Sequence, residues 1–339
     1  MKRHCVLAVL IAGVAAVSAQ PRYEIIGLES LGAPDNDGVT AVDINQWGQA
    51  VGSYWTPGQT ELRLFTYTLG GGIVDLGPSP APIMPAREIN NSGQIVAYGS
   101  VAGVGRAWRY SPGIGYESVA GENDAEGLGI NNRGQVTGSA RINGVGSVFR
   151  YTENIGIENL GRGIGYDIND SGAVTGISQG NVFLYEDGVG MTLLFPGSGS
   201  AINNQGTIAG ETFLTGSEQA FLYANGSFQF LESFGGPSQV WGLNNLNEVV
   251  GETRIGDQIR AFLWREQQGM VDLNTLISPD SGWSLFNATG INDAGQIVGN
   301  GVFNGRNTAF LLQPVPEPST WGLFALGAGA IWLFRRRKR

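Results

Sequence analysis

The sequence predicts an all-β fold, a seven-bladed β-propeller closed by its own N-terminal strand. Three observations lead to this prediction. One phrase built on asparagine and glycine occurs seven times, a second phrase with paired aromatic residues lies between its copies, and the chain opens with a strand-like segment that the last repeat lacks. Four short strands in a repeat of about 40–45 residues are typical of a propeller blade.

The first phrase, of the type INNxGQIVG, predicts a tight turn between two strands. Asparagine favours the first position of a type I turn, and glycine three residues later supplies the left-handed conformation. In the sixth copy Asn247 replaces that glycine, and asparagine is one of the few other residues that accept this conformation. We therefore expect the repeated asparagines to form turns and not to bind a ligand. They are Asn45, Asn90, Asn131, Asn169, Asn203, Asn244 and Asn292.

The second phrase predicts a strand, a turn and a strand, with two aromatic residues at positions i and i+2 of the first strand. Such residues share one face, so we expect each pair to form a buried ridge. An aromatic sugar-binding ladder is the functional alternative, but repetition in every unit favours packing. The pairs are Phe65/Tyr67, Trp108/Tyr110, Phe149/Tyr151, Phe183/Tyr185, Phe221/Tyr223 and Phe262/Trp264.

The two ends of the repeat region predict how the ring closes. The last unit stops after its third strand, at residues 308–314, and residues 23–32 resemble the fourth strands of the other units. We expect the N-terminal strand to complete the last blade, which protects sheet edges from aggregation. The alternative architecture is an open β-solenoid or a stack of hairpins, which would leave residues 23–32 without a partner in the last unit.

The first 19 residues predict a secretory signal peptide. Lys2 and Arg3 precede a short apolar run, and small residues stand at the positions expected before a cleavage site after Ala19. The predicted mature body, residues 20–314, would therefore be exported from the cytoplasm. The remaining residues, 315–339, form a separate C-terminal segment.

That C-terminal segment has three parts. A short motif comes first, followed by an apolar run at residues 321–334 and five consecutive cations at residues 335–339. As an apolar helix the run would be about 21 Å long, short of a bilayer core of roughly 30 Å, and the cations favour the cytoplasmic side. We expect transient membrane insertion through this helix. The motif residues are Val315, Pro316, Glu317, Pro318 and Ser319.

This tail resembles the PEP-CTERM sorting signal of exported bacterial proteins, which implies processing by an exosortase. Those proteins occur mainly in bacteria that make exopolysaccharide and biofilm matrix. The repeats of residues 23–314 are similar to the HAF family of extracellular repeats. The likeness rests on residues 260–264, 269–273 and 288–299, although the family's histidine is absent from every copy. The HAF resemblance implies a fold and a location, and no catalytic function.

Composition excludes several classes of function. His4 and Cys5 are the only histidine and cysteine, and both lie in the predicted signal peptide. This removes disulfides, cysteine–histidine zinc sites and histidine-activated nucleophiles from the mature chain. Residues 20–314 hold 13 arginines, no lysine and 28 acidic residues, a net charge of −15 that argues against nucleic-acid binding. We predict no catalytic, cofactor-binding or metal-ligating residues.

The sequence thus predicts an exported protein of the cell envelope, cell surface or extracellular matrix that is not an enzyme. Its propeller would bind polysaccharide, such as exopolysaccharide, or another surface protein. Two alternatives remain open. One is a carbohydrate-active hydrolase or lyase that uses paired carboxylates, because such enzymes need no histidine. The other is a purely structural matrix component without a discrete ligand.

Overall fold

The computed structural model describes residues 23–28, 38–56, 58, 61–120 and 124–315. Residues Tyr23–Pro314 form one compact unit. The predicted signal peptide and the predicted apolar helix over residues 321–334 lie outside the described residues. Within the described ranges, no helix has both the length and the apolar character needed to cross a membrane.

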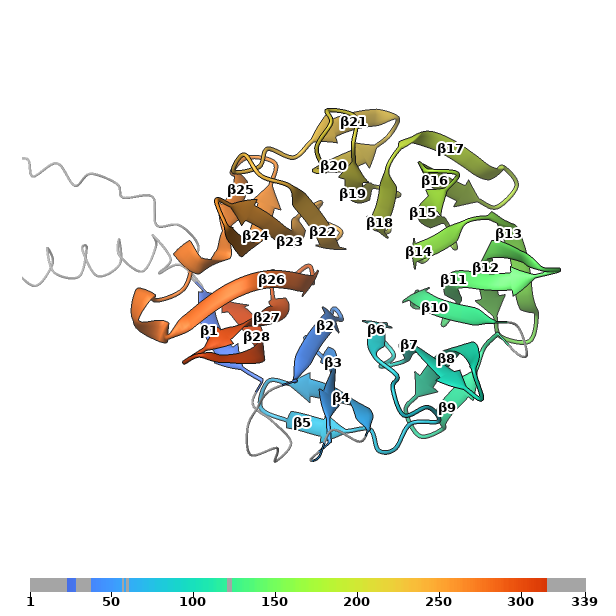
Figure 1. The fold of residues 1–339 in the computed structure, drawn as a ribbon, viewed down its shortest axis with the longest axis horizontal. Helices are drawn as coiled ribbons and strands as arrows, with labels where there is room; N and C mark the ends of the chain where they lie inside the picture. The colour runs from blue at the N-terminus through green and yellow to red at the C-terminus, as the bar shows by residue number, and fades with distance from the viewer. Residues whose placement is uncertain (1–22, 29–37, 57, 59–60, 121–123, 316–339) are drawn as a thin grey trace, which may run out of the picture. The chain divides into compact units, whose positions relative to one another are not determined.

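Seven four-stranded antiparallel sheets surround a common axis, so the prediction of an all-β, seven-bladed propeller is confirmed (Figure 1). In six blades the first strand in sequence lies nearest the axis; in the last blade β26 takes this place and β1 lies outermost. The first three blades contain β2 (Thr40–Ile44), β3 (Ala50–Trp55), β4 (Leu62–Thr68) and β5 (Gly72–Asp75); β6 (Ala86–Ile89), β7 (Ile95–Val101), β8 (Val104–Ser111) and β9 (Gly115–Ser118); and β10 (Ala125–Ile130), β11 (Val136–Ile142), β12 (Val145–Thr152) and β13 (Gly156–Arg162).

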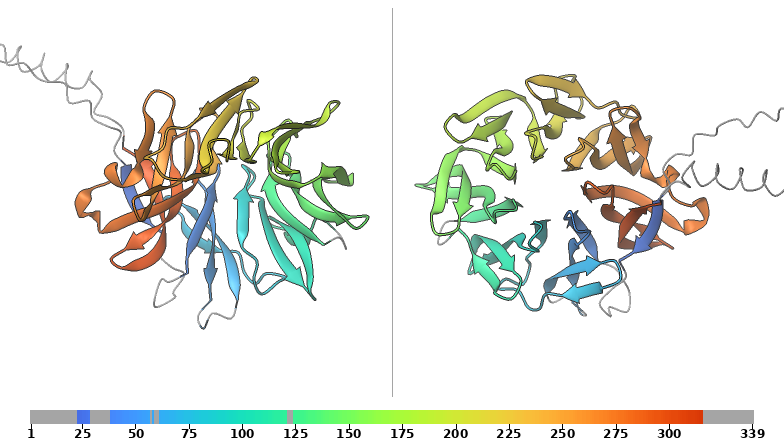
Figure 2. Two further views of the ribbon diagram at one scale, coloured as in Figure 1. Left: turned by 45° about the horizontal axis from the view of Figure 1, so that its top comes forward. Right: turned by 180° about the vertical axis from the view of Figure 1, so that it is seen from behind.

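The other four blades continue the same order around the ring (Figure 2). They contain β14 (Ile164–Ile168), β15 (Val174–Ser178), β16 (Asn181–Glu186) and β17 (Gly190–Pro196); β18 (Ser198–Ile202), β19 (Ile208–Thr212), β20 (Gln219–Ala224) and β21 (Ser227–Phe230); β22 (Ser238–Leu243), β23 (Val249–Ile255), β24 (Gln258–Arg265) and β25 (Gly269–Asp272); and β26 (Trp283–Ile291), β27 (Ile297–Phe303) and β28 (Arg306–Pro314) with β1 (Tyr23–Gly27). Two 3₁₀ turns, Leu273–Thr275 and Pro279–Ser281, precede β26.

The N-terminal strand completes the last blade, as the sequence predicts. β1 pairs antiparallel with β28 over its whole length, from Tyr23 opposite Pro314 to Gly27 opposite Phe310. Just beyond β1, the Leu28 N–H donates to the Ala309 carbonyl oxygen at 2.9 Å, and the Leu28 side chain is fully buried. The two ends of the repeat region are thereby held together by a ladder of backbone hydrogen bonds, and the edge of β28 is covered.

The aromatic pairs on the third strands are buried unequally. The first member of each pair is fully buried in five blades, and Phe310 takes the same place in the last blade. The second member, such as Tyr67 or Tyr151, is half-buried in five blades, whereas Trp264 is buried. The prediction of a wholly buried ridge is therefore wrong for the second position of five blades. It is also wrong for Trp108, the first member in blade 2, which is half-buried.

A glycine on the second strand of six blades is required by close packing. A Cβ at Gly210 would lie 2.0 Å from the Ser198 carbonyl oxygen, which is far inside contact distance. The neighbouring first strand carries a β-bulge at this level, so its backbone comes unusually close. The six glycines are Gly52, Gly138, Gly176, Gly210, Gly251 and Gly299, and blade 2 has Ala97 in the same place.

Candidate functional site in the central channel

The β-bulges of the innermost strands supply the lining of the central channel. In every blade the innermost strand has a residue that is skipped in the pairing with the adjacent strand, for example Tyr166 between Gly165 and Asp167, and β26 has a second one, Phe286. A bulge leaves the extra residue unpaired and turns its side chain in a new direction, which here is the channel. The seven skipped residues that line the channel are Val42, Arg87, Leu128, Tyr166, Ser200, Trp241 and Thr289.

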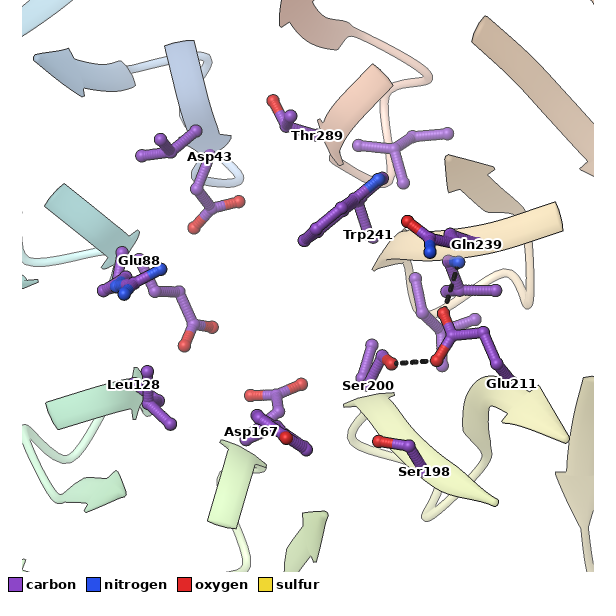
Figure 3. A pocket seen from close by; sticks show the side chains of 18 of the residues that line it. Asp43, Glu88, Leu128, Asp167, Ser198, Ser200, Glu211, Gln239, Trp241 and Thr289 are labelled. Atoms are coloured by element: carbon purple, nitrogen blue, oxygen red, sulfur yellow. Dashed lines mark hydrogen bonds between the residues drawn. The ribbon is translucent and has the colours of Figure 1, made fainter. Parts of the chain in front are cut away.

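These residues surround a cavity of about 400 Å³ on the axis of the propeller. Three carboxylates, those of Asp43, Glu88 and Asp167, extend into it from the strands β2, β6 and β14 (Figure 3). Each stands directly after a bulge residue and two positions before a repeated asparagine. The fold therefore brings together side chains that are separated by up to about 120 residues in the sequence.

Each of these carboxylates also joins its blade to the next blade. Asp43 Oδ2 accepts a hydrogen bond from the Ile89 N–H at 3.0 Å, Glu88 Oε2 from the Ile130 N–H at 2.8 Å, and Asp167 Oδ2 from the Ile202 N–H at 2.7 Å. Each carboxylate thus supplies an acceptor for a backbone N–H group at the channel wall, where no further strand lies beside the innermost one. The three acids thus have a structural use as well as a place in the cavity.

A fourth carboxylate, that of Glu211, makes the equivalent link between blades 5 and 6. Its Oε1 accepts from the Val240 N–H at 2.6 Å, and its Oε2 accepts from the Ser200 hydroxyl at 2.8 Å. Figure 3 shows both bonds at the side of the cavity opposite Glu88. Asn300 does the same between blades 7 and 1, because its Oδ1 accepts from the Ala41 N–H at 3.0 Å.

Burial raises the pKa of all four carboxyl groups. The pKa of Asp43 rises to about 7 and that of Asp167 to about 6, although hydrogen bonds from backbone N–H groups act in the opposite direction. The pKa of Glu88 rises well above its usual value because of burial and then the negative charges of Asp167 and Asp43. The pKa of Glu211 rises to about 7, mainly through burial.

The rest of the cavity wall offers an aromatic surface and further polar groups. Trp241 is half exposed and projects from β22 across the channel from Glu88 (Figure 3). Arg87 is the cation of the wall, and its guanidinium is paired with Glu126 at 2.9 Å. The cavity therefore combines two aromatic residues, Trp241 and Tyr166, with several hydrogen-bond acceptors, and acidic side chains outnumber the one arginine in its wall. Within the described ranges, no cluster of acidic, histidine or cysteine side chains has an arrangement that holds a metal ion.

The repeated asparagines lie at one mouth of the channel, and those of blades 1 to 5 line a second cavity of about 250 Å³. In each, the side-chain oxygen accepts hydrogen bonds from the backbone of its own turn; Asn45 Oδ1 accepts from the N–H groups of Trp47 and Gln49, at 3.1 and 3.0 Å. The residue three positions later is left-handed, with φ of 77° at Gly48 and 60° at Asn247.

The side-chain amide nitrogen of each asparagine donates to the backbone carbonyl oxygen of the asparagine in the next blade. In five copies it also donates to the side chain four residues later, in its own turn. Asn45 donates to Asn90 at 3.0 Å, and the series continues through Asn131, Asn169 and every further copy until Asn292 donates to Asn45. A second ring lies beside it, in which the N–H of the following residue donates to the side chain at the same place in the next blade.

The sequence reasoning assigned turns to these asparagines and missed the ring, because turn geometry alone uses only the side-chain oxygen. It also missed the channel acids. Their signal was present, since Asp43, Glu88 and Asp167 occupy the same position of the repeat, where the other copies have glycine or alanine. Of the sorting motif, only Val315 lies among the described residues; Pro316, Glu317, Pro318 and Ser319 lie outside them.

Residues 314–338 match the PEP-CTERM protein-sorting motif. The chain carries a PEP-CTERM sorting signal. This signal implies export to the cell envelope or surface and processing by an exosortase. The match covers the tail and not the propeller, so the resemblance of the repeats to the HAF family stays a prediction. No curated protein matches the chain significantly.

The propeller is similar to propellers of known structure. The β-propeller domain of the Trilobed protease from Pyrococcus furiosus, described as having an open velcro topology, is 12% identical with a TM-score of 0.57, over 81% of this chain and 93% of that one. A prolyl endopeptidase is 12% identical with a TM-score of 0.54, over 84% of this chain and 51% of that one. A puromycin-hydrolyzing peptidase from Mycobacterium tuberculosis is 12% identical with a TM-score of 0.53, over 83% of this chain and 53% of that one. This chain therefore spans about half the length of either peptidase. At such identities the likeness shows the fold alone.

Proposed function

We propose that the PEP-CTERM protein is a cell-surface or extracellular-matrix protein whose propeller is a non-catalytic binding module for polysaccharide or for another surface protein. The sorting signal supports the location, and the 400 Å³ channel cavity supports binding. The exosortase is the processing partner, and the tail at residues 321–334 inserts transiently into the membrane.

The chemistry of the cavity favours a neutral or cationic sugar over an acidic one. The half-exposed ring of Trp241 offers a face on which a sugar ring stacks, and the carboxylates of Asp43, Glu88 and Asp167 accept hydrogen bonds from hydroxyl groups. Asp167, whose pKa of about 6 leaves it ionised at neutral pH, repels uronic acids. The same acids hold backbone N–H groups of the neighbouring blades, which suits a rigid binding wall.

The test is a glycan array followed by titration calorimetry with any sugar that binds. Replacement of Trp241 by alanine should weaken binding by about tenfold, because the loss of an aromatic contact costs on the order of 1.4 kcal/mol. Phe213→Ala is the matched control, since Phe213 is exposed and lies outside the cavity lining. Equal binding by Trp241→Ala and the wild type would exclude the channel as the site.

One observation favours a second candidate, a carbohydrate-active hydrolase. Glu88 has a raised pKa and lies near Asp43 and Asp167, so it resembles a general acid beside potential partners. Release of reducing ends from the host's exopolysaccharide, abolished by Glu88→Gln, would establish the enzyme and overturn the binding module. A blank array with no protein captured from the cell surface would favour the structural alternative.

A further inference from the structure

One end of the propeller carries the most exposed apolar side chains. We call it the asparagine end, since it contains the seven asparagine turns. Among the described residues, the five large apolar side chains with the highest exposure all lie on turns at this end, and the range is 63% to 81%. They are Trp47 and Leu246 on asparagine turns, and Ile114, Ile155 and Val189 on the turns between the third and fourth strands of blades 2, 3 and 4.

Side-chain hydrogen bonds place the two kinds of turn at the same end. Gln94, on the asparagine turn of blade 2, donates to Ser111 Oγ, which begins the turn that holds Ile114. Gln135 makes the equivalent bond to Thr152 Oγ1, next to the turn that holds Ile155. The exposed residues therefore project from neighbouring turns on successive blades. Each is isolated at a turn tip, where burying it requires an external surface.

The chain also leaves the propeller at the asparagine end. Gln296, on the asparagine turn of blade 7, donates to Gln313 Oε1 at 2.7 Å, and Pro314 is the last residue of β28. The neighbouring Val315 is itself 47% exposed. Only six residues, 315–320, separate Pro314 from the apolar run that begins at Trp321. A segment of that length spans at most about 25 Å when fully extended.

We propose that, while the sorting tail is present, the asparagine end of the propeller lies on the outer surface of the lipid bilayer. This rests on the proposed insertion of residues 321–334. The short connection keeps this end of the propeller close to the lipid headgroups, where tryptophan and aliphatic side chains bind favourably. The opposite end has exposed apolar side chains too, such as Ile83 and Phe213, but the chain does not leave from there.

The charge of the asparagine end determines which lipids it can contact. Glu153 and Asp187, on the turns that also hold Ile155 and Val189, are 66% and 63% exposed at their side chains. Arg109 and Arg150 face these two acids and pair with them, and both arginines are buried. The surface presented to lipid is therefore acidic between its apolar contacts. Zwitterionic phospholipids fit this surface, and anionic phospholipids repel it.

The experiment uses the full-length chain reconstituted into phosphatidylcholine vesicles. A polarity-sensitive fluorophore is attached in turn at Ile114→Cys and at Ile83→Cys, in a Cys5→Ser background. The fluorescence emission of the probe at position 114 should shift to shorter wavelength and be quenched by bromine-labelled lipid. The emission of the probe at position 83 should be the same as in water. The double substitution Ile155→Asp and Val189→Asp should reduce the quenching of the probe at position 114 to the level seen at position 83.

Flotation of the vesicles distinguishes failure of the docking proposal from failure of the tail insertion on which it rests. If the chain does not float with the vesicles, tail insertion has failed, and the docking proposal falls with it. If the chain floats but the probe at position 114 reports water, the propeller stands away from the membrane and the docking proposal alone is wrong. Shielding of position 114 that appears only when envelope proteins are added, without quenching by labelled lipid, would instead identify a protein partner and overturn the lipid surface.

Discussion

The side-chain amide of Asn292 donates a hydrogen bond of 3.0 Å to the backbone carbonyl oxygen of Asn45, although 247 residues separate the two in the sequence. This bond is the seventh of a ring in which each asparagine binds the next. Each asparagine oxygen shapes its own turn while the nitrogen binds the neighbouring blade, so a single side chain links local structure to the closure of the propeller.

Asn131→Asp should destabilise the propeller while it leaves the turn intact. Aspartate keeps the oxygen that accepts from the Arg133 and Gln135 N–H groups, but it loses the donor to the Asn169 carbonyl and to Gln135 Oε1 and places a negative charge beside these oxygens. The position is buried, so we expect a loss of about 1–3 kcal/mol. Urea unfolding followed by circular dichroism measures it. Asn304→Asp on an exposed turn is the control, and an equal effect of the two changes would contradict the importance of the ring.

Leu28→Ala should weaken the closure of the ring. The Leu28 side chain is fully buried in a cluster with Val39, Phe65 and Leu311, between the last blade and the first. Removing such a side chain costs about 2–5 kcal/mol. We expect a lower thermal midpoint and faster proteolysis near β1. Glu24→Ala, an exposed change in the preceding strand β1, should leave both unchanged. A wild-type midpoint for Leu28→Ala would show that the N-terminal strand is dispensable for stability.

The channel carboxyls should make the propeller less stable as the pH rises. The pKa values of Asp43, Asp167 and Glu211 are about 7, 6 and 7 in the folded chain, above their unfolded values near 4. The folded chain then binds more protons, so this contribution to stability is complete below about pH 4 and is lost between about pH 4 and pH 7.

Asp43→Asn tests this pH dependence, because asparagine keeps an acceptor for the Ile89 N–H and does not ionise. Relative to the wild type, its thermal midpoint should rise at pH 8 and stay the same at pH 4. The exposed change Asp257→Asn should alter neither midpoint. A parallel pH curve for Asp43→Asn and the wild type would mean that Asp43 titrates as in water.

Gly210→Ala should prevent normal folding of blade 5. The new Cβ would lie 2.0 Å from the Ser198 carbonyl oxygen and 3.0 Å from Gly199 Cα, and backbone atoms cannot move away cheaply. We expect loss of soluble protein or a loss of several kcal/mol. Gly226→Ala, a turn glycine with no atom within 4 Å of the added Cβ, should cost much less, through its positive φ alone. A mild effect at position 210 would contradict the close approach at the bulge.

The repeat phrases were sufficient to predict the seven blades and the pairing of β1 with β28, because alternation, turn residues and repeat length are local properties that all point to one architecture. The sorting signal was likewise readable, since a contiguous motif carries it. The uneven burial of the aromatic pairs was not predicted. Trp264 is buried where the other blades have a half-buried tyrosine, so burial there depends on packing neighbours such as Leu243 and Met270, which period-two alternation does not encode.

The β-repeats, the sorting signal and the absence of histidine and cysteine from residues 20–314 can all be read from the amino-acid order alone, because each is a local property of the chain. Which side chains meet on the axis is a property of the folded ring. Asp43, Glu88 and Asp167 are ordinary variations within separate repeats, and they become one group because seven bulged strands converge on one channel. Convergence depends on the closure of the ring, and no single repeat contains that information.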